Sequence, residues 1–308
     1  MITYSIIIPH KNTPDLLQYC LDSIPVRNDI QVIVVDDNSD ADKVDFDHFP
    51  RWKGENYECY LTKEGKGAGY ARNVGLKHVN GKWVLFVDAD DFLLPSVNEI
   101  FDEEKDTEAD IVFFRPKAVM LDAQDVPSKR ADIYNAFIDG YLKTGEEVEL
   151  RSQWFSPCSR FFRSSMIREK ELVFEEIRYA NDTVFAAMVG CEADKIAVRD
   201  KYYYMITESD NSLTSLYLSK HGELETRAEA FFRAQQILYE HHYPVNENFA
   251  FEMLRRLVTT NRKVFVRCFK AMQKLCGYSR IGLIKNLFAT NRPMSRFKRS
   301  IYAFVVTF

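Results

Sequence analysis

The segment Asp88-Ala89-Asp90-Asp91 follows the apolar run of residues 83–87 and precedes a second apolar run. Alternate carboxylates on an extended segment can face the same side and share a hard divalent cation. Such a cation can bridge two phosphates and neutralise a departing diphosphate. Acids after a strand can also simply cap a turn or a helix. The position between two buried runs favours the cation site over capping.

Three further residues have side chains that suit nucleotide binding or proton transfer. Asp37 follows the apolar residues 31–35 and can accept a hydrogen bond from a base N–H such as uracil N3, or form an Asx turn. Arg72 follows the glycine-rich residues 65–69 and can meet a diphosphate, unless it is a solvated helix arginine. Asp182 stands at a predicted helix N-terminus, so it is a candidate general base or a capping acid.

The elements that position these residues alternate between apolar strands and helical patterns. Pro9 is expected to end the first strand, and Thr13 and Pro14 to begin the helix after it. This alternation predicts an α/β fold with a mainly parallel sheet, covered on both faces, which binds ligands beyond the carboxyl ends of its strands. The predicted strands are residues 4–8, 31–35, 57–61, 82–87, 110–114 and 195–205, and helices begin near residues 13, 69, 95, 133 and 182. From about residue 216 onward the pattern is helical, with turns near Tyr243-Pro244 and Gly277.

Length and composition suit a globular protein of two domains. The 308 residues are 46% hydrophobic, and no apolar run approaches the roughly 20 residues that cross a bilayer. The sequence starts on a strand-like run without a basic leader, so no signal peptide is expected. The six cysteines contain no CxxC pair, which predicts free thiols and no zinc site. These features predict a cytoplasmic protein.

Positive charge is concentrated at the C-terminus. Residues 251–308 carry 13 Lys or Arg and one acid, and the remaining 250 residues have a net charge of about −16. A basic amphipathic helix can lie on an anionic membrane, so we expect a peripheral protein at the inner face of the plasma membrane. A solvated helical face, or docking on the acidic part of the chain, would give the same pattern. No nucleic-acid partner is expected, because aspartates line the candidate site.

Several motifs within residues 3–215 resemble glycosyltransferase family 2, the inverting transferases with the GT-A fold. They occur in the order typical of that family, and their joint occurrence is more specific than any single motif. The matching segments are Ser5-Ile6-Ile7-Ile8-Pro9-His10-Lys11-Asn12, Val34-Val35-Asp36-Asp37-Asn38-Ser39-Asp40, Ala71-Arg72-Asn73-Val74-Gly75-Leu76, residues 81–91, Asn181-Asp182-Thr183-Val184-Phe185, Tyr202-Tyr203-Tyr204 and Asn211-Ser212-Leu213.

The resemblance implies how a nucleotide-sugar donor would be held. The backbone near Pro9 and His10 and the carboxylate of Asp37 would bind the nucleobase. Arg72 would lie by the nucleotide, and Asp88 would meet the ribose or a metal-bound water.

The resemblance also implies the catalytic chemistry. Asp90 would ligate Mn²⁺ or Mg²⁺, and Asp182 would take the proton of the acceptor hydroxyl as it attacks the anomeric carbon. A single displacement inverts the configuration at that carbon. The chain departs from the family pattern at four positions, which are Lys11 for Tyr, Cys158 for Trp, Asn181 for Glu and Met205 for Arg.

These observations predict a GT-A catalytic domain over residues 1–215, followed by a basic helical extension over residues 216–308. Within the catalytic domain, residues 1–115 would bind the nucleotide and residues 116–215 the acceptor. The expected function is metal-dependent transfer of a sugar from a UDP-sugar to a hydroxyl of a glycan or lipid-linked glycan in cell-surface polysaccharide synthesis. Two alternatives stay open: a sugar nucleotidyltransferase of the same fold, and a non-catalytic, membrane-recruited subunit that binds nucleotides or glycans.

Overall fold

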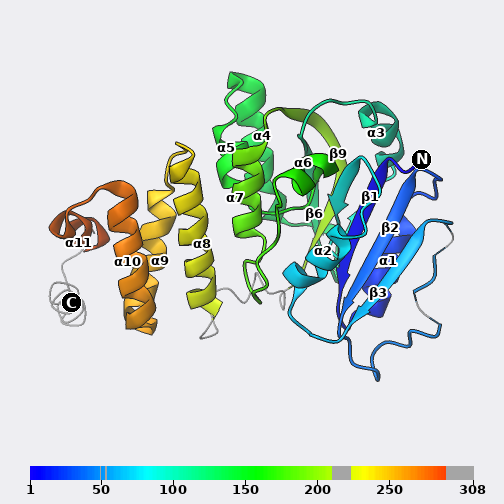
Figure 1. The fold of residues 1–308 in the computed structure, drawn as a ribbon, viewed down its shortest axis with the longest axis horizontal. Helices are drawn as coiled ribbons and strands as arrows, with labels where there is room; N and C mark the ends of the chain where they lie inside the picture. The colour runs from blue at the N-terminus through cyan, green and yellow to red at the C-terminus, as the bar shows by residue number, and fades with distance from the viewer. Residues whose placement is uncertain (49, 53, 210–222, 289–308) are drawn as a thin grey trace. The chain divides into compact units, whose positions relative to one another are not determined.

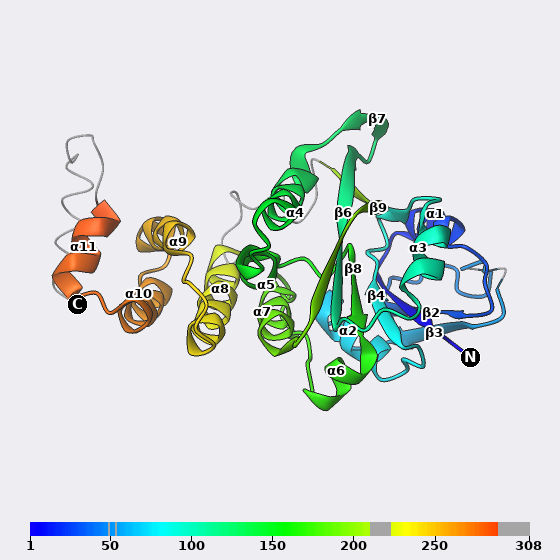
Figure 2. The ribbon, with the colours of Figure 1, turned by 90° about the horizontal axis from the view of Figure 1, so that it is seen from above.

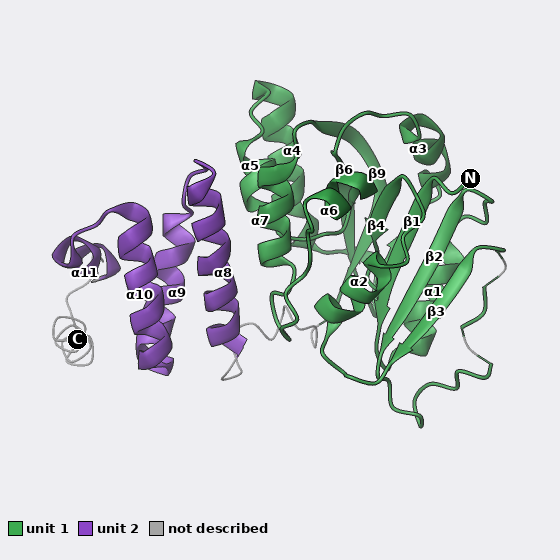
Figure 3. Cartoon of the chain, in the orientation of Figure 1, with its two compact units in different colours: residues 1–212 green, residues 213–308 purple. Residues whose placement is uncertain are grey.

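The computed structural model describes residues 1–48, 50–52, 54–209 and 223–288 (Figure 1). The chain divides into two compact units, residues 1–212 and residues 213–308 (Figure 3). The domain boundary predicted at residues 215 and 216 and the final part of the basic extension, residues 289–308, lie outside the described residues. Within the described ranges, no helix is long and apolar enough to cross a membrane.

The first unit is built on one nine-stranded mixed sheet. Its strands are β1 (Tyr4–His10), β2 (Ile30–Asp37), β3 (Tyr57–Thr62), β4 (Trp83–Phe86), β5 (Phe92–Leu93), β6 (Ile111–Met120), β7 (Ala123–Pro127), β8 (Arg160–Arg163) and β9 (Ile196–Glu208). The strand order is β3-β2-β1-β4-β8-β6-β9-β5, and β7 pairs with β6. β3, β2, β1 and β4 are parallel, as predicted. β8 is antiparallel to both β4 and β6, so the rest of the sheet is mixed.

Helices cover both faces of this sheet (Figure 2). The helices of this unit are α1 (Pro14–Ser23), α2 (Ala68–Leu76), α3 (Val97–Glu104), α4 (Asp132–Thr144), α5 (Val148–Gln153), α6 (Ser164–Glu169) and α7 (Thr183–Glu192). Side chains alternate between faces along each strand. Ile6 and Ile8 of β1 therefore pack in a core with α1 and α3, whereas Ile7 packs in a second core with α2, α5 and α7.

Some predicted limits of elements were wrong. Pro9 does not end the first strand, because β1 continues to His10. The pairing of β1 with β4 stops at Ile7, so Pro9 lies where β2 is the only neighbouring strand and a missing N–H is tolerated. Thr13 is the N-cap residue of α1, as predicted, but its side chain makes no capping hydrogen bond. β5, β7 and β8 were not predicted.

The described part of the second unit is helical, as predicted. Its helices are α8 (Glu223–Glu240), α9 (Glu247–Thr260), α10 (Arg262–Cys276) and α11 (Arg280–Phe288). Asn261 caps α10 by accepting a hydrogen bond from the backbone N–H of Val264, and Gly277 ends that helix at φ +64°. The apolar faces of α9 and α10 pack in a core within this unit, with Leu254 and Phe265 fully buried.

Candidate active site

The acidic turn, Asp88-Ala89-Asp90-Asp91, lies just beyond the carboxyl end of β4. Its three carboxylates have different surroundings. The backbone N–H of Asp91 donates to the carbonyl of Asp88 at 3.0 Å, which closes a tight turn. Thr207 of β9 holds the same turn by donating its hydroxyl to the carbonyl of Asp90 at 2.7 Å. Asp90 is exposed, Asp88 is partly buried and Asp91 is buried. The turn therefore presents two acids toward solvent and one toward the protein.

Asp91 is held from β9. Its carboxylate accepts hydrogen bonds from the hydroxyl of Tyr204 and the backbone N–H of Thr207, both at 2.7 Å. The oxygen of Tyr204 also accepts the N–H of Asp88 at 3.1 Å. Burial and the charges of Asp90 and Asp88 raise the pKa of Asp91 well above its usual range. Asp91 and Tyr204 thus anchor the turn, a role that was not predicted for either residue.

Arg72 links the acidic turn to the segment before α7. It is 5% exposed, and its guanidinium donates to Asp88 Oδ1 at 2.6 Å and to Asn181 Oδ1 at 2.9 Å. The ring of Phe174 lies 5.3 Å from the guanidinium carbon. Burial opposes the positive charge, but nearby anionic groups, including Asp88 and Asp182, hold the pKa of Arg72 above its usual value. Arg72 is therefore a buried cation between two loops rather than a solvated helix arginine.

Asp182 precedes α7 and occupies its N-cap position, but its side chain makes no capping hydrogen bond. The position at the helix N-terminus is as predicted, and it suits both a general base and an acid that interacts with the helix dipole. The chain can bring α2 close to this segment because Gly69 has no side chain. A Cβ at Gly69 would lie 2.9 Å from Cβ of Asn181 and 2.2 Å from the carbonyl oxygen of Glu175.

The donor atoms at the acidic turn suit a hard divalent cation in part. Ligand atoms of Asp88, Asp91 and Cys158 lie within 4.8 Å of one another. Burial and two nearby carboxylates raise the pKa of the Cys158 thiol well above its usual value, so this soft group stays protonated and is a poor ligand for Mn²⁺ or Mg²⁺. Asp90 has surface in contact with solvent, but the protein atoms around its carboxylate partly desolvate it, and this and the charge of Asp88 raise its pKa to about 6. A cation between Asp88 and Asp90 would relieve this repulsion, although the ligand atoms that lie within 4.8 Å of one another are those of Asp88, Asp91 and Cys158.

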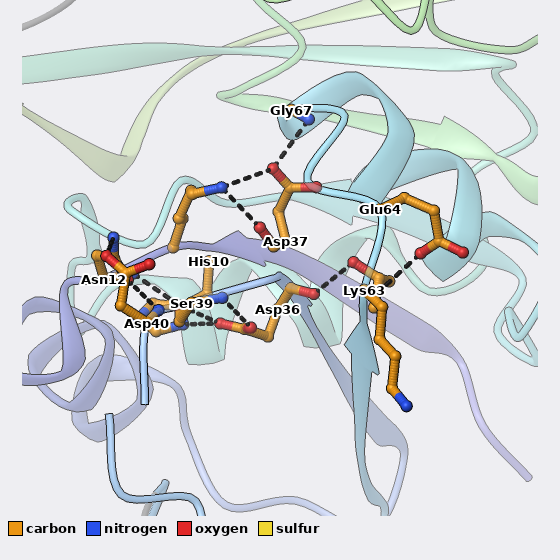
Figure 4. A network of polar contacts seen from close by, with 11 residues as sticks. His10, Asn12, Asp36, Asp37, Ser39, Asp40, Lys63, Glu64 and Gly67 are labelled. Carbon is orange, nitrogen blue, oxygen red and sulfur yellow. Dashed lines mark hydrogen bonds and ion pairs between the residues drawn. The ribbon is translucent and has the colours of Figure 1, made fainter. Parts of the chain in front are cut away.

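A second polar cluster lies at the carboxyl ends of β1 and β2 (Figure 4). Asp37, the last residue of β2, is 4% exposed, and its Oδ2 accepts the N–H of Gly67 at 2.8 Å. Gly67 adopts φ +98°, which favours glycine. Oδ1 of Asp37 is buried and has no hydrogen-bond partner within the protein. A buried carboxylate oxygen without a partner is costly, so this atom marks a place for a donor from a ligand.

Pro9 and His10 end β1 beside this cluster. Nδ1 of His10 lies 2.8 Å from Asp36 Oδ2, while Nε2 accepts the backbone N–H of Thr13 at 3.2 Å. Nδ1 must therefore carry the proton that is donated to Asp36. The imidazole of His10 is buried in these contacts, so its two ring nitrogens are already used within the protein.

The structure brings the predicted residues together in two places. Asp37, Pro9 and His10 lie at the ends of β2 and β1, while Arg72, Asp88 and Asp90 gather beyond β4, which is the other neighbour of β1. Asp182 is near enough to Arg72 for its negative charge to contribute to the raised pKa of that arginine. Trp154 is a core residue, because it is 1% exposed and packs on Phe113 and Tyr134.

The chain is similar to several known proteins. The model of the family described as Glycosyl transferase family 2 matches residues 5–169. A poly(ribitol-phosphate) beta-glucosyltransferase of Bacillus spizizenii is 27% identical over 223 residues, which cover 70% of this chain and 34% of the relative. The poly(ribitol-phosphate) beta-N-acetylglucosaminyltransferase TarS of Staphylococcus aureus is 27% identical over 234 residues, which cover 71% of this chain and 38% of TarS. The chain thus spans little more than a third of the length of these two relatives.

A solved structure shows the same fold. Residues 1–349 of S. aureus TarS in complex with UDP-GlcNAc superpose with a TM-score of 0.64 at 18% identity, covering 99% of this chain and 89% of the TarS chain. This similarity confirms the predicted GT-A fold and its helical C-terminal part. The match to the family model covers more than half of the sequence, and the chain belongs to glycosyltransferase family 2.

Proposed function

We propose that this protein is a metal-dependent inverting glycosyltransferase that transfers a sugar from a UDP-sugar to a hydroxyl of a glycan or lipid-linked glycan. The observation that carries the proposal is the buried, unpartnered Oδ1 of Asp37 at the end of β2, together with the carboxylates of Asp88 and Asp90 beyond β4. β2 and β4 both pair with β1, so a nucleotide at this edge of the sheet can reach both groups.

The donor would bind with its base against Asp37. An N–H of the base would supply the hydrogen bond that Oδ1 lacks, and the backbone of Pro9 and His10 would lie beside the ring. Arg72 would act through Asp88, which it holds at 2.6 Å and which would face the ribose. The UDP-GlcNAc in the similar TarS structure supports a UDP-linked donor.

The acidic turn would hold Mn²⁺ or Mg²⁺ through Asp90, with Asp88 in contact through water. A bound divalent cation would stabilise the negative charge that develops on the leaving diphosphate. Asp91 would contribute indirectly, because its hydrogen bonds to Tyr204 and Thr207 fix the turn that carries the other two acids.

Asp182 would be the general base that accepts the proton of the acceptor hydroxyl. Base catalysis of this kind contributes about 10²–10⁴-fold to the rate. The relatives named above act on poly(ribitol phosphate) according to their names, so an anionic polyol polymer is one acceptor to test beside neutral glycans.

The second unit would contribute a membrane contact. Lys263, Lys270 and Lys274 are exposed on α10 at a spacing that places them on one stripe. The apolar face of α10 is used in the core of its own unit, so the contact would be electrostatic rather than an inserted amphipathic helix. The protein would then work at the cytoplasmic face of the plasma membrane, in surface polysaccharide synthesis.

The transferase proposal is tested by measuring UDP release from UDP-sugars with candidate acceptors, with and without Mn²⁺. We expect Asp182→Asn to lower turnover by about 10²-fold or more while UDP binding is retained, because only the base is lost. Asp194→Asn is the matched control, since Asp194 is an exposed acid just beyond the other end of α7. Full turnover in Asp182→Asn would contradict the assignment of the base. Nucleotide binding without turnover by any donor in the wild type would favour a non-catalytic subunit.

A further inference from the structure

Lys11 places an ammonium group directly beside the carboxylate of Asp37. Lys11 is the first residue after β1, and its Nζ donates to the backbone carbonyl of Asp37 at 2.9 Å. The same Nζ lies 3.6 Å from Asp37 Oδ2, and its side chain is 46% exposed, against 5% for the side chain of Asp37. The side chain of Lys11 is therefore partly accessible to solvent, and it lies beside a carboxylate whose other oxygen, Oδ1, is buried without a partner.

The two side chains together present a donor next to an acceptor. An ammonium group carries three N–H donors, and the carbonyl of Asp37 accounts for one of them. The carboxylate presents Oδ1 as a free acceptor. A base edge with an N–H beside a carbonyl oxygen, as in uracil, complements this pair. In the same register, cytosine places a bare ring nitrogen against the carboxylate and an amino group against the ammonium, so each of the two groups meets one of its own hydrogen-bonding kind.

We propose that Lys11 is a specificity-determining residue, which donates a hydrogen bond to a carbonyl of the base next to the N–H that Asp37 accepts. This inference rests on the proposed function, and it adds a reason why uracil is bound in preference to cytosine. The chain has Lys11 where the family pattern has Tyr. A charged hydrogen bond from Lys11 to the base would therefore take the place of a contact between an aromatic side chain and the base.

The competing explanation is that Lys11 only offsets the buried negative charge of Asp37. In that case removal of the ammonium would weaken the binding of all nucleotides to a similar extent, or lower stability without changing preference. The hydrogen-bond explanation requires that removal of the ammonium changes the ratio of the affinities for UDP and CDP. The ratio therefore separates a specificity role from a purely electrostatic or structural one.

The experiment measures dissociation constants of UDP and CDP by calorimetry, at fixed Mn²⁺ and fixed salt, for the full chain and its variants. A hydrogen bond to a charged group contributes about 1.5–3 kcal/mol, so we expect Lys11→Met to lower the preference for UDP over CDP by about tenfold or more. Lys11→Arg keeps a donor and should keep most of the preference. Lys63→Met is the matched control, because Lys63 is an exposed lysine whose side chain points away from Asp37 in Figure 4.

Each outcome is decisive. A preference for UDP that falls in Lys11→Met but not in Lys63→Met supports the inference. An unchanged preference in Lys11→Met, or an equal fall in both variants, overturns the inference while the proposed function stands. A wild type that prefers CDP overturns the inference and the choice of UDP as donor. A wild type that binds neither nucleotide overturns the proposed function and the inference with it. A thermal melt of each variant shows that it is folded before binding is measured.

Discussion

Gly69 controls how closely α2 approaches the segment that leads to Asp182, and Gly69→Ala tests this geometry. Gly69 is buried in the first turn of α2. An added Cβ would lie 2.2 Å from the carbonyl oxygen of Glu175 and 2.9 Å from Cβ of Asn181. The closer contact is with backbone, which cannot rotate away as a long side chain can. Either α2 or the segment before α7 therefore has to move.

The size of the movement follows from the distances. Ordinary van der Waals contact begins near 3.4 Å, so the contact at 2.2 Å requires a displacement of about 1.2 Å. Overpacking of this kind costs about 1–3 kcal/mol, partly offset by the better helix propensity of alanine, which is worth about 1 kcal/mol. A displacement of about 1 Å at catalytic groups can lower turnover by about 10²-fold. We expect Gly69→Ala to lower the free energy of unfolding by up to about 2 kcal/mol and turnover by 10-fold or more.

Urea denaturation and steady-state turnover on the same folded sample separate the two effects. Gly81→Ala is the matched control, because its Cβ would lie 2.7 Å from the backbone nitrogen of Ser5, at the amino end of β4 and away from the acidic turn. It should lose stability and keep its turnover. Gly140→Ala, whose nearest neighbour is a carboxylate oxygen of Glu149 at 3.3 Å, should fold at least as stably as the wild type. Wild-type stability and turnover in Gly69→Ala would refute the packing argument, and equal loss of turnover in Gly81→Ala would refute the specific link to Asp182.

Two further predictions concern pH and charge. Burial raises the pKa of Asp36, but hydrogen bonds from His10 and other donors outweigh it and lower that pKa below its usual value. The stability contributed by the Asp36 carboxylate is therefore complete above about pH 4. It is lost as pH falls through the lower folded pKa, so the gap in unfolding free energy between wild type and Asp36→Asn should narrow below pH 4; a widening gap would contradict this. Replacing Lys263, Lys270 and Lys274 by Gln should weaken sedimentation with anionic vesicles by about 10²-fold at low salt, at about 1 kcal/mol per charge; unchanged binding would remove the membrane proposal.

The fold was predictable where the sequence signal is local. β1, β2 and β4 are continuous apolar runs, because parallel strands are buried on both faces and need apolar side chains on each. β8 gave no such signal, since its four residues begin and end with arginine. It forms because β4 and β6 on either side offer unpaired backbone groups to it. Pairing of this kind depends on the assembled sheet, so a short antiparallel strand is not visible in its own residues.

The acidic residues of the candidate site could be predicted from the sequence, whereas the residues that contact the site's charged side chains could not. Asp37, Asp88 and Asp90 follow apolar strands, and that position is readable from sequence alone. The partners of Arg72 are not, because Asn181 lies 109 positions away along the chain and becomes a neighbour only after α2 packs on the segment before α7. Cys158, two residues before β8, likewise becomes a neighbour of the acidic turn only when β8 pairs with β4 in the folded sheet.

The acidic turn illustrates why residue type alone does not assign a role. Three aspartates occur within four residues, and their spacing alone does not show which partners hold each carboxylate. Tyr204 and Thr207 of β9 make the difference, because their hydrogen bonds take up both carboxylate oxygens of Asp91 and turn it inward. Asp90 accepts the Thr207 hydroxyl at its backbone carbonyl, and the residue has surface exposed to solvent. In the proposed site a cation would meet Asp90 from solvent, and Asp91, whose ligand atom lies within 4.8 Å of those of Asp88 and Cys158, would fix the turn from the protein side.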